Sequence, residues 1–408
     1  MRRSVDDHLR VVLDTVRPLP PFEQSLAEAL GLVLCADVDS TISLPGFDNS
    51  AMDGYAVRAA DLAGATEEHP VTLPVTGEVA AGSGAPIAVA PGTAIRIMTG
   101  APVPHGADAV VPVEWTDGGI ANVAVVQQPD VGNSIRRMGE DLGAGDRLLD
   151  AGTVIGPRQV ALLAAVGRPR VLVRPRPRVV IVSSGSELRE PGTPLGEGEV
   201  YDANSYALAA AARQAGAVPY RVGIVADDPK TVMDTLNDQL VRADVVVTSG
   251  GVSKGAYDVV KEVLSTLGTV EFTEVVMQPG KPQGFGVIGE DETPIFTLPG
   301  NPVSAYVSFE VFVRPALRKL MGHEPYTRTP VTATVTEPFR SARGKRQFAR
   351  GLASRTPDGW QVRVVGGHGS HLVGDLSRSN ALVVVPEHIT GMVPGEQVET
   401  WLLDEGPA

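Results

Sequence analysis

The segment RVVIVSSGSEL, residues 178–188, decides the fold of this chain. Its first half is the continuous apolar run of a strand that is buried on both faces, and its second half is a turn of small residues. The segment NSYALAAAARQAG (204–216) follows with the pattern of a helix that Asn204 caps and Gly216 ends. Strand and helix patterns alternate as far as residue 322, which predicts an α/β domain with a parallel sheet and helices on both faces.

The rest of the chain shows other residue patterns, which predict further domains. At 408 residues it exceeds the size of a single core, so we expect two to four domains. From Leu44 to about Ala144 the chain holds short β-rich runs between Gly and Pro, which predicts a β domain inserted between helical parts. In the helical part before it, FEQSLAEALGLVLCADV (22–38) predicts a short helix, a stop at Gly31 and a strand. Residues 326–408 are again strand-rich and predict a small β domain.

The composition excludes several classes of protein. The net charge of −13 argues against non-specific binding to nucleic-acid backbones, because nucleic-acid-binding proteins carry a basic surface. Cys35 is the only cysteine, which rules out an intramolecular disulfide and favours a reducing compartment. No run of about 18 apolar residues is present, and acids stand where a signal peptide would be apolar. We therefore expect a cytoplasmic protein.

The chemistry is expected at the carboxyl ends of the predicted strands, where open α/β sheets bind ligands. These ends carry glycine- and serine-rich turns, carboxylates and a Pro-flanked loop: Ser183, Ser184, Gly185, Ser186 and Glu187; Asp227 and Asp228; Ser249, Gly250, Gly251 and Ser253; and LPGNP, 298–302. Small residues let backbone amides approach an anion closely. The carboxylates would repel that anion unless a cation such as Mg²⁺ binds both. The pattern predicts a Mg²⁺-assisted site for a phosphorylated or nucleotide-like ligand. The alternative is that each Gly and Ser only serves its own turn.

Two other patterns concern hydrolase and metal chemistry. GVSKG (251–255) fits the nucleophile elbow of a hydrolase and would make Ser253 the nucleophile, but Lys254 and GAYD continue a turn where the elbow needs a helix. His368 and His371 lack the spacing of a metal cluster and are interpreted as loop residues.

Seven motifs occur in a fixed order: NSAMDGYAV, RIMTGA, GEDL, SSGSEL, GGVSKGAYD, PGKP and LPGNPVSA. With them the chain resembles the molybdopterin molybdenumtransferase family, which includes the MoeA proteins and the E domain of gephyrin. The resemblance implies a discontinuous first domain (1–44 plus 142–176), an inserted β-rich domain (45–141), a mononucleotide-binding-type α/β domain that binds molybdopterin (177–325) and a C-terminal β-barrel domain (326–408). It also implies a homodimer whose cleft joins the third domain of one subunit to the second domain of its partner.

The reaction implied by the resemblance is the last step of molybdenum cofactor synthesis, in which adenylylated molybdopterin and molybdate react, with Mg²⁺, to give the cofactor and AMP. The motif positions imply catalytic roles for Asp53, Thr99 and Asp141 on the second-domain side, for Glu187, Asp227 and Asp258 as carboxylates that place metal and substrate, and for Lys281 as positive charge. They imply substrate binding by Ser184, Gly185, Gly250, Gly251 and Ser253, with Pro299, Asn301 and Pro302 shaping the loop.

The chain departs from the family pattern near PGKP. Glu274 and Gln278 stand where many members carry lysine, so two cations that could balance molybdate or phosphate are lost, and Lys281 and Lys254 are expected to compensate. A gephyrin-like scaffold dimer, linking membrane receptors or tubulin-like cytoskeletal proteins with weak or no transferase activity, is therefore the alternative. Other expected partners are a molybdopterin adenylyltransferase and molybdoenzymes, and nucleic acid is not expected.

Overall fold

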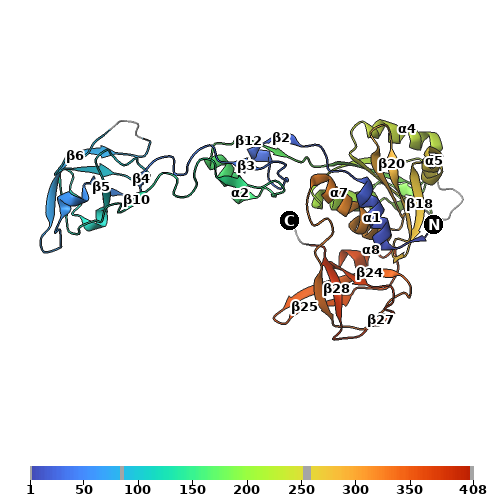
Figure 1. Cartoon of the computed structure of the whole chain (residues 1–408). Coiled ribbons are helices and arrows are strands. Elements are labelled where there is room, and N and C mark those ends of the chain that lie inside the picture. The colour runs from blue at the N-terminus through green and yellow to red at the C-terminus, as the bar shows by residue number, and fades with distance from the viewer. Residues whose placement is uncertain (1, 83–86, 251–258, 405–408) are drawn as a thin grey trace. The chain divides into compact units, whose positions relative to one another are not determined.

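The computed structural model describes residues 2–82, 87–250 and 259–404 (Figure 1). The chain divides into two compact units, which are described separately. The large unit comprises residues 1–36, 152–157 and 170–408, and the small unit comprises residues 37–151 and 158–169. None of the helices in the described ranges is long and apolar enough to cross a membrane. The four domain boundaries implied by the resemblance stay a prediction.

A seven-stranded sheet forms the centre of the large unit. Its order is β1 (Arg2–Arg3), β18 (Val270–Val275), β20 (Pro282–Ile288), β21 (Thr293–Leu298), β17 (Val245–Ser249), β13 (Arg178–Ser184) and β16 (Val218–Val225). The last four strands are parallel, as predicted. The sheet as a whole is mixed, because β20 runs antiparallel to both β18 and β21. A short turn joins β20 to β21, and a connection of that length can only produce an antiparallel pair.

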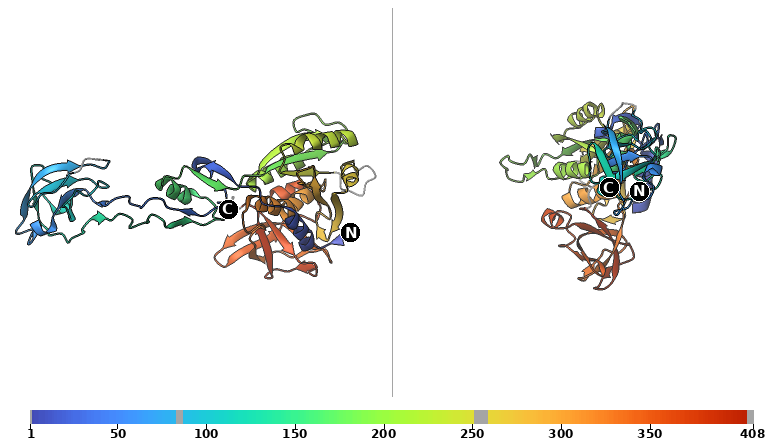
Figure 2. Two further views of the ribbon diagram at one scale, coloured as in Figure 1. Left: turned by 45° about the horizontal axis from the view of Figure 1, so that its top comes forward. Right: turned by 90° about the vertical axis from the view of Figure 1, so that its left-hand side faces the viewer.

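Alternate residues of each central strand enter two different cores. Val179 and Ile181 of β13 join a core with α1 (Val5–Thr15), α3 (Asn204–Gln214), α6 (Pro302–Ser308), the π-helical turn η4 (Phe309–Val313) and α7 (Arg314–Met321). Val180 and Val182 join the opposite core with α4 (Pro229–Leu240) and α5 (Val259–Leu267). Helices therefore cover both faces of the sheet, as Figure 2 shows. This two-sided burial explains the continuous apolar run in the sequence.

The C-terminal strands of the large unit close into a barrel, as expected. The ring runs β24 (Arg346–Thr356), β25 (Gly359–Val364), β22 (Val331–Val335), β28 (Gln397–Leu402) and β26 (Ala381–Val385), and β26 pairs back with β24. Its core is made of Val, Ala and Leu side chains. The short strand β19 (Met277–Gln278) pairs with β24 and so attaches the segment before PGKP to the barrel.

The small unit is built on a five-stranded sheet of order β8 (Ala109–Pro112), β5 (Gly54–Val57), β7 (Ala94–Ile97), β6 (Val71–Val79) and β9 (Asn122–Val125). A Cβ atom on Gly54 would lie 1.9 Å from the carbonyl oxygen of Val111, so only glycine permits this pairing of β5 with β8. The strand β4 (Asn49–Ser50) pairs with β10 (Ile135–Arg136). The motif NSAMDGYAV therefore begins in one strand pair and ends in β5, an inner strand of the sheet.

The helix predicted after residue 22 is wrong. Phe22–Ser25 form strand β2, which pairs antiparallel with β12 (Arg170–Val173), and only the 3-10 turn η1 (Leu26–Glu28) is helical. The long-range pairing overrides the local helical pattern. The helix α2 spans Pro157–Ala165. The remaining elements are β3 (Val38–Asp39), β11 (Arg147–Leu149), β14 (Leu188–Arg189), β15 (Val200–Tyr201), β23 (Phe339–Arg340), β27 (Gly391–Met392), α8 (Val373–Ser377), η2 (Ala59–Leu62) and η3 (Val113–Trp115).

Candidate functional site

Asp53 and Thr99, which the resemblance placed on one side of the cleft, do contact each other in the small unit. Asp53 precedes β5, and its Oδ1 accepts hydrogen bonds from the backbone N of Thr99 at 2.7 Å and from its Oγ1 at 2.8 Å. These bonds lower the pKa of the Asp53 carboxyl below its usual range. The carboxylate is therefore ionised at neutral pH, exposed, and fixed in direction.

Asp141 lies on a neighbouring loop of the same unit. Its backbone N donates to the carbonyl oxygen of Leu44 at 3.0 Å, and its side chain is exposed. The loop is attached through Asp48, whose carboxylate pairs with Arg137 at 2.6 Å and accepts from the N of Met138 at 2.7 Å. Asp48 thus has a structural role, whereas the side chains of Asp53 and Asp141 are exposed.

The large unit brings Glu187 and Asp227 to one edge of its sheet. They follow β13 and β16, which are parallel neighbours, and the N of Ser186 donates to Oδ2 of Asp227 at 2.9 Å. The carboxylate of Glu187 lies over Gly185, because a Cβ there would be 2.8 Å from Glu187 Oε2. Asp228 plays a different part, since its Oδ2 caps α4 through the N of Thr231 at 2.8 Å.

The next turn along this edge packs closely on the first. Gly250 has a φ of +92°, and a Cβ on it would lie 2.8 Å from the carbonyl oxygen of Ser184. The N of Gly250 donates to the carbonyl oxygen of Leu298 at 3.2 Å, which ties the turn to the start of LPGNP. Gly250 is therefore required by its backbone conformation as well as by close packing. Gly251, Ser253, Lys254 and Asp258 lie outside the described residues.

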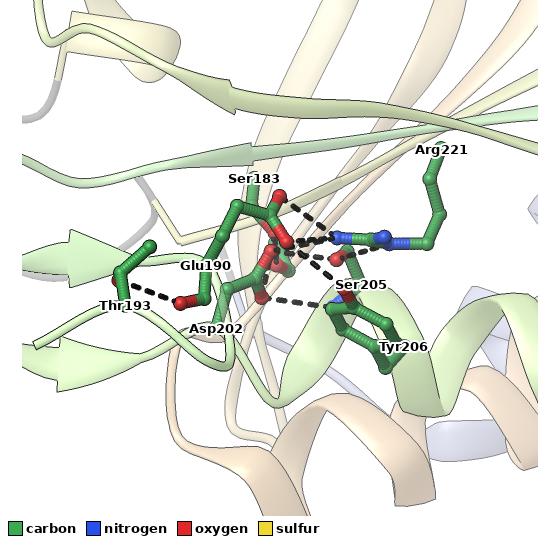
Figure 3. Close-up of polar contacts among 8 residues, drawn as sticks. Ser183, Glu190, Thr193, Asp202, Ser205, Tyr206 and Arg221 are labelled. Carbon is green, nitrogen blue, oxygen red and sulfur yellow. Dashed lines mark hydrogen bonds and ion pairs between the residues drawn. The ribbon is translucent and has the colours of Figure 1, made fainter.

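A buried carboxylate that the sequence analysis missed supports this edge (Figure 3). Asp202 is 1% exposed, and its Oδ1 accepts from Ser183 Oγ at 3.1 Å and from the N of Ser205 at 3.0 Å. Asp202 therefore stabilises the first turn of α3, and the predicted Asn204 cap is wrong. Asn204 instead donates from Nδ2 to the carbonyl oxygen of Gly300 at 2.7 Å, which fixes the LPGNP loop.

The same network extends to Arg221. Its Nε donates to Ser205 Oγ at 2.8 Å, and its Nη2 lies 3.0 Å from Glu190 Oε1. Tyr206 packs its ring 3.5 Å from the guanidinium carbon and donates from its hydroxyl to Glu190 Oε2 at 2.9 Å (Figure 3). The loop between β13 and α3 is thereby cross-linked to β16. The signal for Asp202 in the sequence was the position of this acid two residues before the predicted helix start at Asn204.

A pocket of about 320 Å³ lies between the PGKP loop, the LPGNP loop and the barrel. Its lining includes Lys281, Gln278, Pro299, Gly300, Asn301, Ser304, Lys345, His368 and Ser370. Lys281 and Lys345 bring positive charge, while Nζ of Lys281 pairs with Glu274 Oε1 at 2.9 Å. Pro302 begins α6 beside the pocket, and Asn301 stands at its N-cap position. The barrel residues Lys345 and Ser370 were not predicted as site residues, and His368 was interpreted only as a loop residue.

The donor set fits a hard cation. Within the described residues no group of three His, Cys, Asp or Glu side chains could hold a metal by itself. Glu187 and Asp227 nevertheless offer two carboxylates on adjacent turns, and Mg²⁺ typically takes one or two carboxylates together with substrate phosphates. The third predicted ligand, Asp258, lies outside the described residues.

Comparison with known proteins covers nearly the whole chain. Residues 3–167 match the MoeA N-terminal region (domain I and II), residues 180–319 a probable molybdopterin binding domain, and residues 332–403 the MoeA C-terminal region (domain IV). Molybdopterin molybdenumtransferase 2 of Mycobacterium tuberculosis strain H37Rv is 47% identical, over 98% of this chain and 99% of that protein. Molybdopterin molybdenumtransferase 1 of the same strain is 43% identical, over 99% of both.

Solved structures agree with the sequence relatives. The crystal structure of the molybdopterin biosynthesis MoeA protein from Pyrococcus horikosii superimposes with a TM-score of 0.83 at 31% identity, over 99% of this chain and 100% of that chain. With three family regions in order, full-length relatives above 40% identity and a shared fold, the chain belongs to the MoeA family.

Proposed function

We propose that this protein inserts molybdenum from molybdate into adenylylated molybdopterin and releases AMP, the last step of molybdenum cofactor biosynthesis. One observation carries the proposal: the LPGNP loop lies between a glycine turn that suits phosphate and a pocket with two lysines. Gly300 approaches Gly250, since a Cβ on it would lie 3.6 Å from Gly250 Cα, and Gly300 also lines the pocket. The names of the full-length relatives support the same reaction.

The proposed roles of the site residues follow from their charges. The phosphates of the adenylylated substrate would lie at the small-residue turns around Gly185 and Gly250, because turns without bulky side chains let the backbone approach an anion closely. Lys281 and Lys345 attract the molybdate dianion into the neighbouring pocket. Glu187 and Asp227 would hold Mg²⁺, which when bound neutralises charge on the phosphoric anhydride.

The Asp53 side of the site is proposed to come from a second copy of the chain. Asp53 is ionised and exposed, with Thr99 fixing its direction, so its carboxylate is available to a ligand outside its own unit. Asp53→Ala protein and Glu187→Ala protein should each be inactive alone and should recover part of the activity when mixed, because a mixed dimer has one intact cleft. A mixture that stays inactive, although mass spectrometry shows exchanged dimers, would contradict the shared cleft.

The reaction itself is tested with purified protein, adenylylated molybdopterin, molybdate and Mg²⁺. AMP release that depends on molybdate and falls in Glu187→Gln supports the proposal, and release unchanged by that substitution contradicts it. The single cysteine and the absence of a long apolar run support a cytoplasmic location. Nothing in the described part of the chain favours the scaffold role.

A further inference from the structure

A second pocket of the large unit, about 180 Å³ in volume, shares no residue with the proposed site. It is bounded by residues 30–31, the C-terminal end of α3 and helix α7. Six of its lining residues are ionisable: Arg176, Arg314, Arg318, Arg328, Glu310 and His323. The continuous helix α6–η4–α7 starts beside LPGNP and delivers Glu310, Arg314 and Arg318 to this pocket. Glu310 lies in the π-helical turn, a deviation that is frequent at functional sites.

The lining carries more positive charge than its own carboxylate can balance. The lining includes four arginines and one glutamate. That glutamate, Glu310, forms an ion pair with Arg328, whose Nε lies 2.7 Å from Glu310 Oε2. Arg318 donates to the carbonyl oxygen of Pro325 at 2.7 Å, and Arg176 to that of Leu30 at 2.9 Å. Carbonyl oxygens satisfy N–H groups without cancelling their charge. Glu310, Arg318 and Arg328 are all more than nine-tenths buried, so water compensates poorly.

Arg314 has a guanidinium donor that the described residues leave without a hydrogen bond. Its Nη1 is buried and has no hydrogen-bond partner among the residues that the structure describes. Its Nε lies 4.0 Å from Glu310 Oε2, and the side chain is 16% exposed. Burial, followed by the charge of Arg328, lowers the pKa of Arg314 to about 10, so the guanidinium is still charged at neutral pH. A buried cation with an unused donor is costly unless an anion joins it.

We infer that this pocket binds a small inorganic oxyanion of the phosphate class, between Arg314 and Arg318. Guanidinium forks match tetrahedral oxyanions, and such charge-assisted bonds are the strongest that side chains make. Size restricts the ligand: sites for drug-sized molecules span roughly 300–1,000 Å³, and this pocket has about 180 Å³. The pocket therefore suits a small ion, and it shares no lining residue with the proposed substrate site.

The inference is tested by titrating inorganic phosphate into the full-length protein by isothermal calorimetry at low chloride. The variant is Arg314→Met, and the matched control is Arg213→Met, which changes an exposed arginine in the last turn of α3. Loss of a guanidinium from the site should weaken phosphate binding by about tenfold or more, while the control keeps the wild-type Kd. Equal affinity in wild type and Arg314→Met overturns the inference.

Two further measurements separate an ion site from a purely structural arginine. Without phosphate, Arg314→Met should melt at the same temperature as the wild type or higher, because a buried cation with an unsatisfied donor is removed while Glu310 stays paired with Arg328. Phosphate should raise the Tm of the wild type and not that of the variant. A lower Tm of the phosphate-free variant overturns the inference, and so does loss of the calorimetric signal in Lys281→Gln, which would place the ion in the PGKP pocket.

Discussion

Removing the charge of Glu274 should strengthen molybdate binding. Glu274 stands where many family members carry lysine, and its Oε1 lies 2.9 Å from Nζ of Lys281, which lines the larger pocket. The carboxylate therefore competes with the incoming dianion for the same ammonium group. Glu274→Gln keeps the side-chain size and leaves Lys281 to the anion.

The exposure of the pair sets the size of the effect. Lys281 and Glu274 are 38% and 34% exposed, so solvent screens their attraction. Pairs of this kind contribute about 0.2–1 kcal/mol, and the upper end corresponds to roughly a fivefold change in an equilibrium constant. The KM for molybdate should therefore fall by about 1.4- to fivefold, with kcat little changed. Glu274→Lys, which adds a cation, should lower it further.

The assay is the rate of AMP release as a function of molybdate concentration, at low ionic strength so that screening stays small. Glu271→Gln is the matched control, because Glu271 lies on the same strand, β18, and pairs with Arg3 at 2.6 Å. That variant should keep the wild-type KM. A KM that Glu274→Gln leaves unchanged or raises, or that both variants lower equally, would refute the role given to the Lys281 pair.

Three further substitutions test other parts of the structure. Gly185→Ala should displace the carboxylate of Glu187 and the side chain of Leu188, because its Cβ would lie 2.8 Å from Glu187 Oε2 and 2.9 Å from Leu188 Cγ, and should therefore lower kcat; wild-type turnover would contradict this placement. Gly250→Ala should lower stability by about 1–3 kcal/mol, seen as a lower Tm, because its φ is +92° and its Cβ would meet the carbonyl oxygen of Ser184 at 2.8 Å. His8→Phe should flatten the dependence of Tm on pH between 6.5 and 4. Burial lowers the pKa of His8 to about 4 from 6.5, so the unfolded chain takes up a proton in this window that the folded chain does not, and up to about 3 kcal/mol of stability is lost as the pH falls. An unchanged pH profile would show that His8 is not the group responsible.

The parallel half of the sheet was predictable because local sequence carries its signal. Strands buried on both faces are continuous apolar runs, and Val179–Val182 is such a run. The antiparallel strand β20 was not predictable in this way. Gly286 would suggest a turn, yet it is needed because a Cβ there would lie 2.1 Å from the carbonyl oxygen of Thr269. Such close approach depends on tertiary packing, which local pattern does not reveal.

Some residues of the candidate site could also be located from local sequence, whereas others come together only through tertiary structure. Residues at strand ends, such as Glu187 and Asp227, could be located because parallel strands end at one edge. The position of Asp202 before a predicted helix was the only local signal for it, and its contact with Ser183, 19 residues away, is made only in the folded chain. Lys345 and His368 come from the barrel and meet Lys281 only through tertiary structure. The ion pair of Lys281 with Glu274 likewise revises the expectation that Lys281 simply compensates for the missing lysines.

The most direct test of the proposed function compares two adjacent carboxylates. Asp227 accepts from the N of Ser186 at the edge of the sheet, whereas Asp228 caps α4 through Thr231, and asparagine caps a helix equally well. The measurement is molybdate-dependent AMP release from adenylylated molybdopterin by Asp227→Asn and Asp228→Asn, both verified as folded by Tm. The account predicts a loss of at least tenfold in kcat for Asp227→Asn and near wild-type turnover for Asp228→Asn. Equal turnover by the two variants, or AMP release by the wild type that ignores molybdate, would contradict it.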